Sequence, residues 1–376
     1  MSGNRAAAAL DSGSFLASRY SIIPGDPQAH KRDVLALADR NLLVPLQGRE
    51  ARYAKYYEQN PAGPPSFFLA RDETSRAFVG MAAAFPTRLR VFGEVVPAAV
   101  SGDFAVDDGH RGFGPSVALQ RAVVSALDEN HLQCAFGYPS EDAEPIVKRV
   151  GYVDLGRLSR FAKVLETRLL VDMHVRSAAL ARPLGALSSV ALDPVLSVVS
   201  RERLRRRRHG FRVERPDRFD DRFSNVWEST WRQHAVTTER TPELLNWKYE
   251  QGGTRDGGIY TIFSLHGSDD RVAAYAVYRV RDRIRHLVDI AFLPSREVVD
   301  ALLSELILDA RQHEVRAITL LHLGSPNLLT RRLWMFGFLR REAKSGVRIY
   351  VSPSSGLGQE MVEAGNWYFL TGDADV

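Results

Sequence analysis

The chain has 376 residues, with 45% hydrophobic and 25% charged side chains, ordinary values for a globular protein with room for two domains. Its single cysteine, Cys134, excludes an internal disulfide framework and a cysteine-based metal site, and no apolar run reaches the roughly 18 residues of a membrane span. The formal net charge of +5 comes largely from residues 201–209 (RERLRRRRH), so the basic character is local. We expect a cytoplasmic protein without a signal peptide.

The first half alternates predicted strands and helices. Residues 1–17, rich in Ala, Ser and Gly, are predicted to form a mobile tail. The apolar pattern then predicts, in chain order, a strand at 20–23, helices at 33–43 and 49–59, strands at 67–71, 79–91 and 95–106, a helix at 117–127, a strand at 133–138, a helix at 140–150 with Ser140 as its N-cap, and a strand ending near 165. Gly151 ends the last helix. This order indicates an α/β (α+β) domain over residues 18–165.

The most informative stretch is residues 101–116 (SGDFAVDDGHRGFGPS), in which a strand runs through a polar turn into a helix. Gly112 and Gly114 let the backbone bend, and Pro115 fits the first helical turn, where its missing N–H costs nothing. Free N–H groups and the helix dipole favour an anion such as a pyrophosphate. An ordinary glycine-rich turn is the alternative. The spacing matches neither a dinucleotide-binding fingerprint nor a P-loop.

This loop resembles the Arg/Gln-x-x-Gly-x-Gly/Ala motif of the GNAT acyltransferase superfamily, which binds the pyrophosphate of acyl-coenzyme A. Arg111 and Gly114 hold its first and fourth positions, and Ser116 stands where Gly or Ala is usual. The element order and the pair Gly151-Tyr152 extend the resemblance across the first half. It implies acetyl-CoA as the co-substrate and the following cofactor-binding residues: Phe104, Ala105, Val106, Arg111, Gly112, Phe113, Gly114, Pro115 and Ser116.

Acyl transfer to an amine needs a base for the amine, a donor for the oxyanion and a proton for the departing thiolate. The resemblance places residues 104–106 beside the pantetheine arm, with one N–H on the thioester carbonyl. Asp103 is the candidate base; a carboxylate that caps a turn or pairs with an arginine is the alternative. Val147 stands where the family usually has an acidic tyrosine, which leaves Tyr138 and Tyr152 as candidate acids or as core aromatics. The histidines show no ligand spacing, so no metal is expected.

Residues 166–212 interrupt this pattern. They are rich in Leu, Val and Ala, are broken by Pro183 and Pro194, and end in the arginine run. We expect a helical, basic linker. A peripheral contact of this linker with an anionic surface is the alternative to a solvated bridge between domains.

The second half repeats the first. Residues 246–253 (NWKYEQGG) echo residues 55–63 (KYYEQNPAG), and predicted strands at 259–265, 272–280, 284–293 and 317–323 and a helix at 298–313 follow in the same order. We therefore expect two tandem GNAT-like domains, each a mixed, mostly antiparallel sheet flanked by helices, with the second at 213–376. Here LPSREVV replaces the glycine loop, and Glu297 would repel phosphates, so the second domain is not expected to bind coenzyme A.

The tandem plan resembles acyltransferases encoded with bacterial polysaccharide genes and, in outline, Fem-type aminoacyl transferases. It implies direct transfer of an acyl group, with acetyl as the expected one, from acyl-CoA to a small amine such as an amino sugar. Two alternatives stay open: a non-catalytic fold that binds an anionic partner, favoured by the missing tyrosine at 147, and an aminoacyl transferase that uses charged tRNA, disfavoured by the intact Arg-x-x-Gly. Nucleic acid is otherwise not an expected partner, and the sequence leaves the oligomeric state open.

Overall fold

The computed structural model describes residues 19–42, 48–111, 113–166, 202, 210–249 and 259–374. The predicted tail at 1–17 and nearly all of the predicted linker lie outside these residues. Within the described part, no helix is both long and apolar enough to cross a membrane.

The first half contains the elements that its apolar periodicity predicts. They are β1 (Tyr20–Pro24), α2 (Lys31–Asn41), α3 (Arg49–Tyr53), η1 (Ala54–Glu58, a π-helical turn), β2 (Ser66–Asp72), β3 (Phe78–Val91), β4 (Glu94–Val106), η2 (Asp108–His110), α4 (Phe113–Glu129), β5 (Cys134–Gly137), α5 (Glu144–Arg149) and β6 (Val153–Val164).

The second half adds short elements around the same kind of framework. It contains β7 (Arg212–Glu214), η3 (Asp221–Phe223), α9 (Ser224–Trp231), β8 (Val236–Thr238), α10 (Pro242–Tyr249), β9 (Thr261–His266), β10 (Val272–Arg281), β11 (Ile284–Phe292), α11 (Arg296–Gln312), β12 (Ala317–Leu323), α12 (Leu328–Met335), β13 (Leu339–Val351), η4 (Gln359–Val362), η5 (Ala364–Asn366), β14 (Trp367–Leu370) and η6 (Thr371–Asp373).

The two halves have the same strand order. β2, β3 and β4 are antiparallel neighbours, and β5 lies parallel to β4 after helix α4. β9, β10 and β11 are likewise antiparallel, and β12 lies parallel to β11 after helix α11. Helices α4 and α11 have 17 residues each. The predicted mixed α/β fold is thus confirmed.

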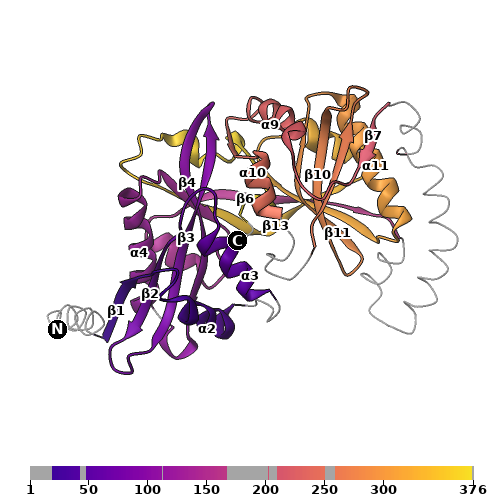
Figure 1. Cartoon of the computed structure of the whole chain (residues 1–376). Coiled ribbons are helices and arrows are strands. Elements are labelled where there is room, and N and C mark those ends of the chain that lie inside the picture. Colours follow the sequence, from indigo (N-terminus) through magenta and orange to yellow (C-terminus); the bar gives the residue numbers. More distant parts are fainter. Residues whose placement is uncertain are drawn as a thin grey trace, which may run out of the picture.

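The strands of both halves join in one continuous 14-stranded sheet. At the join the halves exchange a strand: β13 of the second half pairs with β5, and β6 of the first half pairs with β12. β6 and β13 also pair with each other, and Figure 1 shows them between the two groups of strands. Periodicity predicts that a segment is a strand but not its partner, which explains why the sequence did not predict this exchange.

Two helical layers cover the sheet of the first half. Alternate residues of β3 face opposite sides: Ala82 and Ala84 pack with α4 and α5, whereas Met81 and Ala83 pack with α2, α3 and η1. We call these sides the α4 face and the α2 face.

Two helix starts differ from the prediction. α4 begins at Phe113, inside the glycine loop rather than after it. α5 begins only at Glu144, and Ser140 does not cap it; the Ser140 hydroxyl accepts the N–H of Ala143 at 3.2 Å in the turn that precedes the helix. Gly151 follows α5 with a φ of 103°, the left-handed conformation expected of a helix-ending glycine.

Candidate active site

Strands β4 and β5 pair over only part of their length and then separate. Their parallel pairing ends at Val100 and Phe136, and β5 ends at the next residue, Gly137. A Cβ on Gly137 would lie 3.0 Å from the carbonyl oxygen of Ser101, so the two chains touch where the separation begins. Beyond this point no described strand pairs with β4 on its β5 side. We call the space beside residues 101–106 the β4–β5 wedge.

The predicted anion-binding loop follows the wedge directly. After η2, helix α4 begins with Phe113, and its first turn contains Gly114 and Pro115 but no acidic side chain. The first N–H groups of a helix have no partner within it, and the dipole makes this end positive. The buried hydroxyl residue Ser116 completes the turn. Residue 112 and the side chain of Phe113 lie outside the described part.

Arg111 stands at the mouth of this loop. Its side chain is 58% exposed, its Nε donates to the carbonyl of Val106 at 3.2 Å, and one Nη lies 2.8 Å from Asp108. An exposed pair of this kind is weak, so an anion can replace Asp108 as the partner of the guanidinium. The predicted phosphate contact stays a prediction that this position favours.

Asp103 lies in a bulge of β4 within the wedge. Met81 of β3 pairs with Ala105 and Ala83 pairs with Gly102, so Asp103 and Phe104 together oppose a single residue. Asp103 has a φ of 46°, a left-handed conformation that is strained outside glycine.

Both carboxylate oxygens of Asp103 are engaged. The two Nη atoms of Arg52 donate to them at 2.6 and 3.1 Å, and the Tyr57 hydroxyl donates at 2.8 Å. Burial would lower the pKa of Arg52, but the Asp103 carboxylate more than offsets this and raises it. Burial raises the pKa of Tyr57 well above its usual value, so this hydroxyl remains a donor. The predicted role of Asp103 as a base remains untested, and the alternative of an arginine-paired carboxylate describes its contacts.

The candidate acids Tyr138 and Tyr152 lie on opposite faces of the sheet. Tyr138 continues the side of β5 that holds Cys134 and Phe136, and its ring packs against Phe369 with centroids 5.5 Å apart. Asp103 lies on this same side of the sheet, the α2 face, because its carboxylate contacts Arg52 and Tyr57 there. Tyr152 packs on the α4 face instead. The wedge therefore groups Tyr138 with Asp103 and separates Tyr152 from both.

Tyr152 nevertheless reaches the wedge from its own side. Its hydroxyl lies 2.8 Å from the Ser101 hydroxyl at the point where β4 and β5 separate. Burial raises the pKa of Tyr152 to about 12, against a smaller lowering by the bond with Ser101. The phenol is thus a proton donor at neutral pH. Val147, at the position of the family's usual acid, is buried in the α4-face core.

The corresponding space in the second half is filled by the C-terminal segment. β11 and β12 pair only up to Leu287 and Leu320 and then separate. β14 pairs with β12 at His322 and Leu323, on the edge that faces β11, because β6 holds the opposite edge. The chain's own last strand thus occupies what we call the β11–β12 wedge.

Hydrogen bonds fix this segment in place. The Tyr368 hydroxyl of β14 donates to the carbonyl of Ile290 on β11 at 2.6 Å. In the η6 turn, a Cβ on Gly372 would meet the Tyr249 hydroxyl and would lie 3.0 Å from the carbonyl oxygen of Val288. The C-terminal segment thus packs directly against β11 in the position that corresponds to the β4–β5 wedge.

The start of α11 also differs from the start of α4. Ser295 caps α11 by accepting the N–H of Glu297 at 3.2 Å, and Glu297 lies in the first turn. One of the free N–H groups at the start of α11 therefore has a partner, and the carboxylate of Glu297 offsets part of the positive helix dipole there. That the second half does not hold a pyrophosphate stays a prediction.

Sequence reasoning missed Arg52, Tyr57 and the filling of the second wedge. Arg52 and Tyr57 lie about fifty residues before Asp103, and nothing local marks their pairing. The filling segment did carry a signal, because Trp367-Tyr-Phe-Leu370 is an apolar run between polar turns, a pattern typical of a buried strand.

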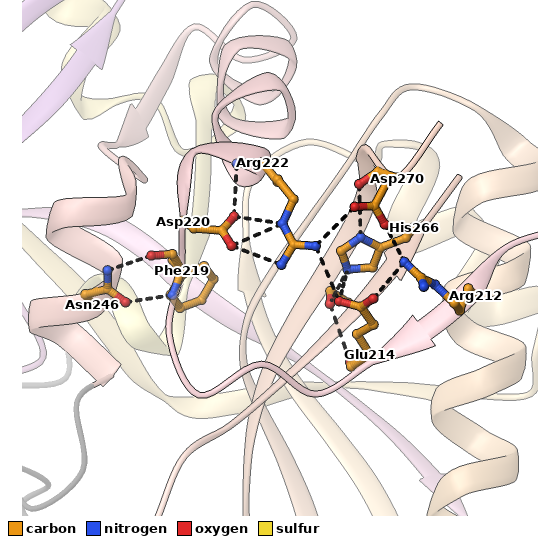
Figure 2. A network of polar contacts seen from close by, with 9 residues as sticks. Arg212, Glu214, Phe219, Asp220, Arg222, Asn246, His266 and Asp270 are labelled. Atoms are coloured by element: carbon orange, nitrogen blue, oxygen red, sulfur yellow. Dashed lines mark hydrogen bonds and ion pairs between the residues drawn. The ribbon is translucent and has the colours of Figure 1, made fainter. Parts of the chain in front are cut away.

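Three groups that could bind a metal meet at the outer edge of the second half: Glu214, His266 and Asp270. Figure 2 shows the guanidinium groups of Arg212 and Arg222 against the same two carboxylates. Because these cations already neutralise the carboxylates, we assign an ion-pair network to the cluster. The expectation that the protein uses no metal stays a prediction.

Comparison with known proteins identifies this architecture. Residues 29–153 match the family model described as an acetyltransferase (GNAT) domain. Curated protein sequences gave no match. Solved structures similar to the chain include a conserved protein from Enterococcus faecalis, a probable N-acyltransferase (12% identity, TM-score 0.64, 89% of this chain and 73% of that chain).

Two further structures are similar over the same span. They are GCN5-related N-acetyltransferases from Anabaena variabilis (13% identity, TM-score 0.60, 89% of this chain and 73% of that chain) and from Kribbella flavida (15%, 0.57, 88% and 71%). At these identities the structures show the fold alone, and the family model covers residues 29–153. Residues 29–153 therefore match a GNAT acetyltransferase domain, and the fold of the chain as a whole is similar to that of the three solved structures.

Proposed function

We propose that the chain transfers an acetyl group from acetyl-CoA to a small amine, with an amino sugar or a polysaccharide precursor as the favoured acceptor. One observation carries the proposal: the β4–β5 wedge leads directly to the start of α4, which has glycine rather than an acidic residue in its first turn. In the second half β14 pairs with β12 at the corresponding position, and the first turn of α11 contains Glu297 in place of glycine.

The proposed donor site is built mainly from backbone. Phe104, Ala105 and Val106 run along the wedge, and an unpaired strand edge can hydrogen-bond the amides of a pantetheine arm much as it would another strand. The pyrophosphate would lie at the start of α4. The residues proposed to surround it are Arg111, Gly112, Phe113, Gly114, Pro115 and Ser116.

We propose direct transfer within a ternary complex. The amine lone pair attacks the thioester carbonyl carbon, so that an N–C bond forms and the carbonyl oxygen becomes an oxyanion. The C–S bond then breaks, the sulfur leaves with the bonding electrons and takes up a proton, and the amine gives up a proton to water. An N–H at the β4 bulge would stabilise the oxyanion. Tyr138 is the favoured proton donor to sulfur, and Tyr152 is the second candidate.

The acceptor is proposed to bind where the two halves meet. Residues 49–65 approach α10 there: the Trp247 indole donates to the carbonyl of Lys55 at 2.9 Å, and the Lys55 ammonium donates to the carbonyl of Lys248 at 2.6 Å. The preference for an amino sugar comes from the resemblance of the tandem plan to acyltransferases of polysaccharide gene clusters.

We assign donor binding to residues 18–165 and a supporting role to residues 213–376, and we propose that the halves arose by duplication. Their equal strand order supports this. We propose that the protein acts in the cytoplasm. The basic segment 201–209 is proposed to be a solvated part of the linker, with an anionic surface as its alternative partner.

Two measurements test the proposal. Calorimetry should detect acetyl-CoA binding by the wild-type protein, weakened about 10- to 100-fold in Arg111→Ala through loss of a charge-assisted contact. Equal binding by both proteins, or none by either, contradicts the proposed site. A screen of thiol release from acetyl-CoA with amino sugars, amino acids and polyamines should then identify the acceptor class. If none of these amines causes thiol release, the proposed acceptor class is wrong.

A further inference from the structure

We infer that Arg52 and Tyr57 are positioning residues that act through Asp103. By holding the Asp103 carboxylate they fix the bulged part of β4 and thereby place the backbone N–H that contacts the thioester carbonyl. The inference rests on the proposed function and assigns Asp103 a role other than that of general base.

The first argument is the strain at Asp103. A non-glycine residue with a φ of 46° persists only where its surroundings hold it, and such residues concentrate at functional sites. Here the hold comes from two helical segments: α3 contributes Arg52, and η1 contributes Tyr57. Side-chain exposure is only 6% for Arg52 and 3% for Asp103, so water does not loosen the contact.

The second argument is that a base needs a lone pair directed at its substrate. The three bonds from Arg52 and Tyr57 are directed to both carboxylate oxygens, and the pairing with a buried guanidinium stabilises the charged form. Such a carboxylate is a poor proton acceptor and a good anchor.

The third argument comes from the second half, which repeats the cluster without the donor site. Asp289 of β11 accepts Nε of Arg240 at 3.0 Å and the hydroxyl of Tyr249 at 2.9 Å. β11 is also bulged here, because Val277 pairs with Asp289 and Tyr278 pairs with Leu287. An aspartate–arginine–tyrosine cluster that recurs beside a filled wedge serves to fasten a bulged strand to the segments packed against it, here α10 and the loop that precedes it.

The two clusters differ where function predicts a difference. Asp289 does not have a positive φ, and Arg240 also donates to both oxygens of Asp373 at 2.9 and 3.0 Å, which ties the cluster to the segment that fills the wedge. Only Asp103 holds its strand in a left-handed conformation beside the β4–β5 wedge. The strained backbone thus coincides with the proposed donor site.

The matched variants Tyr57→Phe and Tyr249→Phe test the inference. Each removes only the hydroxyl group of the tyrosine, and with it one hydrogen bond to the aspartate of the bulge. The probe is acetyl-CoA labelled with ¹³C at the carbonyl, bound to the full chain and observed by isotope-edited infrared spectroscopy. In wild type the carbonyl band should shift to lower wavenumber on binding. In Tyr57→Phe most of this shift should be lost at nearly unchanged affinity, and in Tyr249→Phe it should persist.

A pH profile separates positioning from base catalysis. Acetyl-CoA hydrolysis by Tyr57→Phe should fall about 10- to 100-fold at every pH, as expected for a displaced donor, without moving the limbs of the profile. If Asp103 were the base, loss of a hydrogen bond to its charged form would raise its pKa and move the acidic limb upward.

Three results would each overturn the inference: a carbonyl band shift in Tyr57→Phe equal to that of wild type, an equal loss of this shift in Tyr57→Phe and Tyr249→Phe, or an acidic limb of the pH profile that moves in Tyr57→Phe. Urea denaturation should show a similar loss of stability in both variants. If Tyr57→Phe does not fold, Arg52→Lys takes its place. It keeps the positive charge but loses the two-point contact with Asp103, and it must give the same loss of the band shift. Absence of acetyl-CoA binding by wild type would instead remove the proposed function.

Discussion

The two halves of the molecule share a framework and differ in what lies between their diverging strands. Each has three antiparallel strands, a 17-residue helix and a parallel fourth strand that separates from its neighbour. In the first half the β4–β5 wedge has no described strand in it, whereas in the second half β14 fills the β11–β12 wedge. The same framework can therefore leave this position without a described strand or fill it with a later strand of the same chain.

The comparison separates residues that occur in both halves from residues that occur in one half, and we propose that only the latter determine acetyl-CoA binding. The bulge cluster and the apolar faces occur in both halves and belong to the framework. The glycine in the first turn of α4 occurs in one half, and in the other half Ser295 caps α11 and Glu297 lies in its first turn. Exchanging these local features should therefore change binding without disturbing the fold.

The largest effect is expected for Gly114→Glu. Gly114 is the second residue of α4, and Glu297 is the second residue of α11, so this change copies the second half into the first. A carboxylate at the proposed pyrophosphate site should weaken acetyl-CoA binding about 1000-fold, or ~4 kcal/mol. Stability should stay equal or rise, because an acidic residue suits a helix start better than glycine.

Glu297→Gly is the matched control for this change. It should lower the free energy of unfolding by about 1 kcal/mol and leave acetyl-CoA affinity unchanged. Calorimetry and urea denaturation measure both quantities. Retained binding in Gly114→Glu would mean that the pyrophosphate does not lie at the start of α4.

The next effect concerns the two candidate acids. Tyr138 shares a side of the sheet with Asp103, and Tyr152 lies on the other. With the acceptor found in the screen, Tyr138→Phe should lower kcat about 100-fold, the usual scale for general acid catalysis, and Tyr152→Phe less than about tenfold. The reverse ranking would place the leaving thiolate on the α4 face.

A smaller effect is expected from crowding the filled wedge. In Gly372→Ala the new methyl group would meet the Tyr249 hydroxyl and the Val288 carbonyl, so unfolding should become easier by about 2 kcal/mol. Gly109→Ala, which meets nothing within 4 Å, is the control. Acetyl-CoA affinity should stay at the wild-type value in Gly372→Ala. A parallel loss of affinity would show that the filled wedge supports the open one.

The smallest effect is a pH dependence from the filled wedge. Burial, and to a lesser extent the charge of Arg340, lowers the pKa of His322 from 6.5 to about 4. Between these values the unfolded chain binds a proton that the folded chain does not, so stability falls as the pH falls. Urea denaturation should show that the free energy of unfolding falls between pH 7 and pH 5. This fall should be about 1.5 kcal/mol smaller in His322→Gln than in wild type. Equal losses would mean that His322 titrates normally in the folded protein.

The sequence predicts the elements of this fold better than their connections. The apolar pattern locates β3, β4, β10 and β12 closely, because each is a largely apolar run bounded by polar residues or turns. The exchange of β6 and β13 is set by long-range pairing, which no local pattern encodes. The start of α5 was predicted too early because Ser140 supports a turn before the helix rather than the helix itself.

The candidate site divides in the same way. The loop around Arg111 and Gly114 could be predicted because its chemistry lies within a few consecutive residues. The contacts of Asp103 could not, since Arg52 and Tyr57 come from α3 and η1, distant in the sequence. Arg240 and Arg52 also stand at different spacings from Tyr249 and Tyr57, which hides the repeated cluster from a comparison of the two halves.

The most direct measurement of the central claim is a calorimetric titration of the wild-type chain, Gly114→Glu and Glu297→Gly with acetyl-CoA. We expect a single binding site per chain in wild type and in Glu297→Gly, and none in Gly114→Glu under the same conditions. Binding of a second molecule, or loss of binding in Glu297→Gly with the site in Gly114→Glu retained, would contradict the assignment of the donor site to the first half.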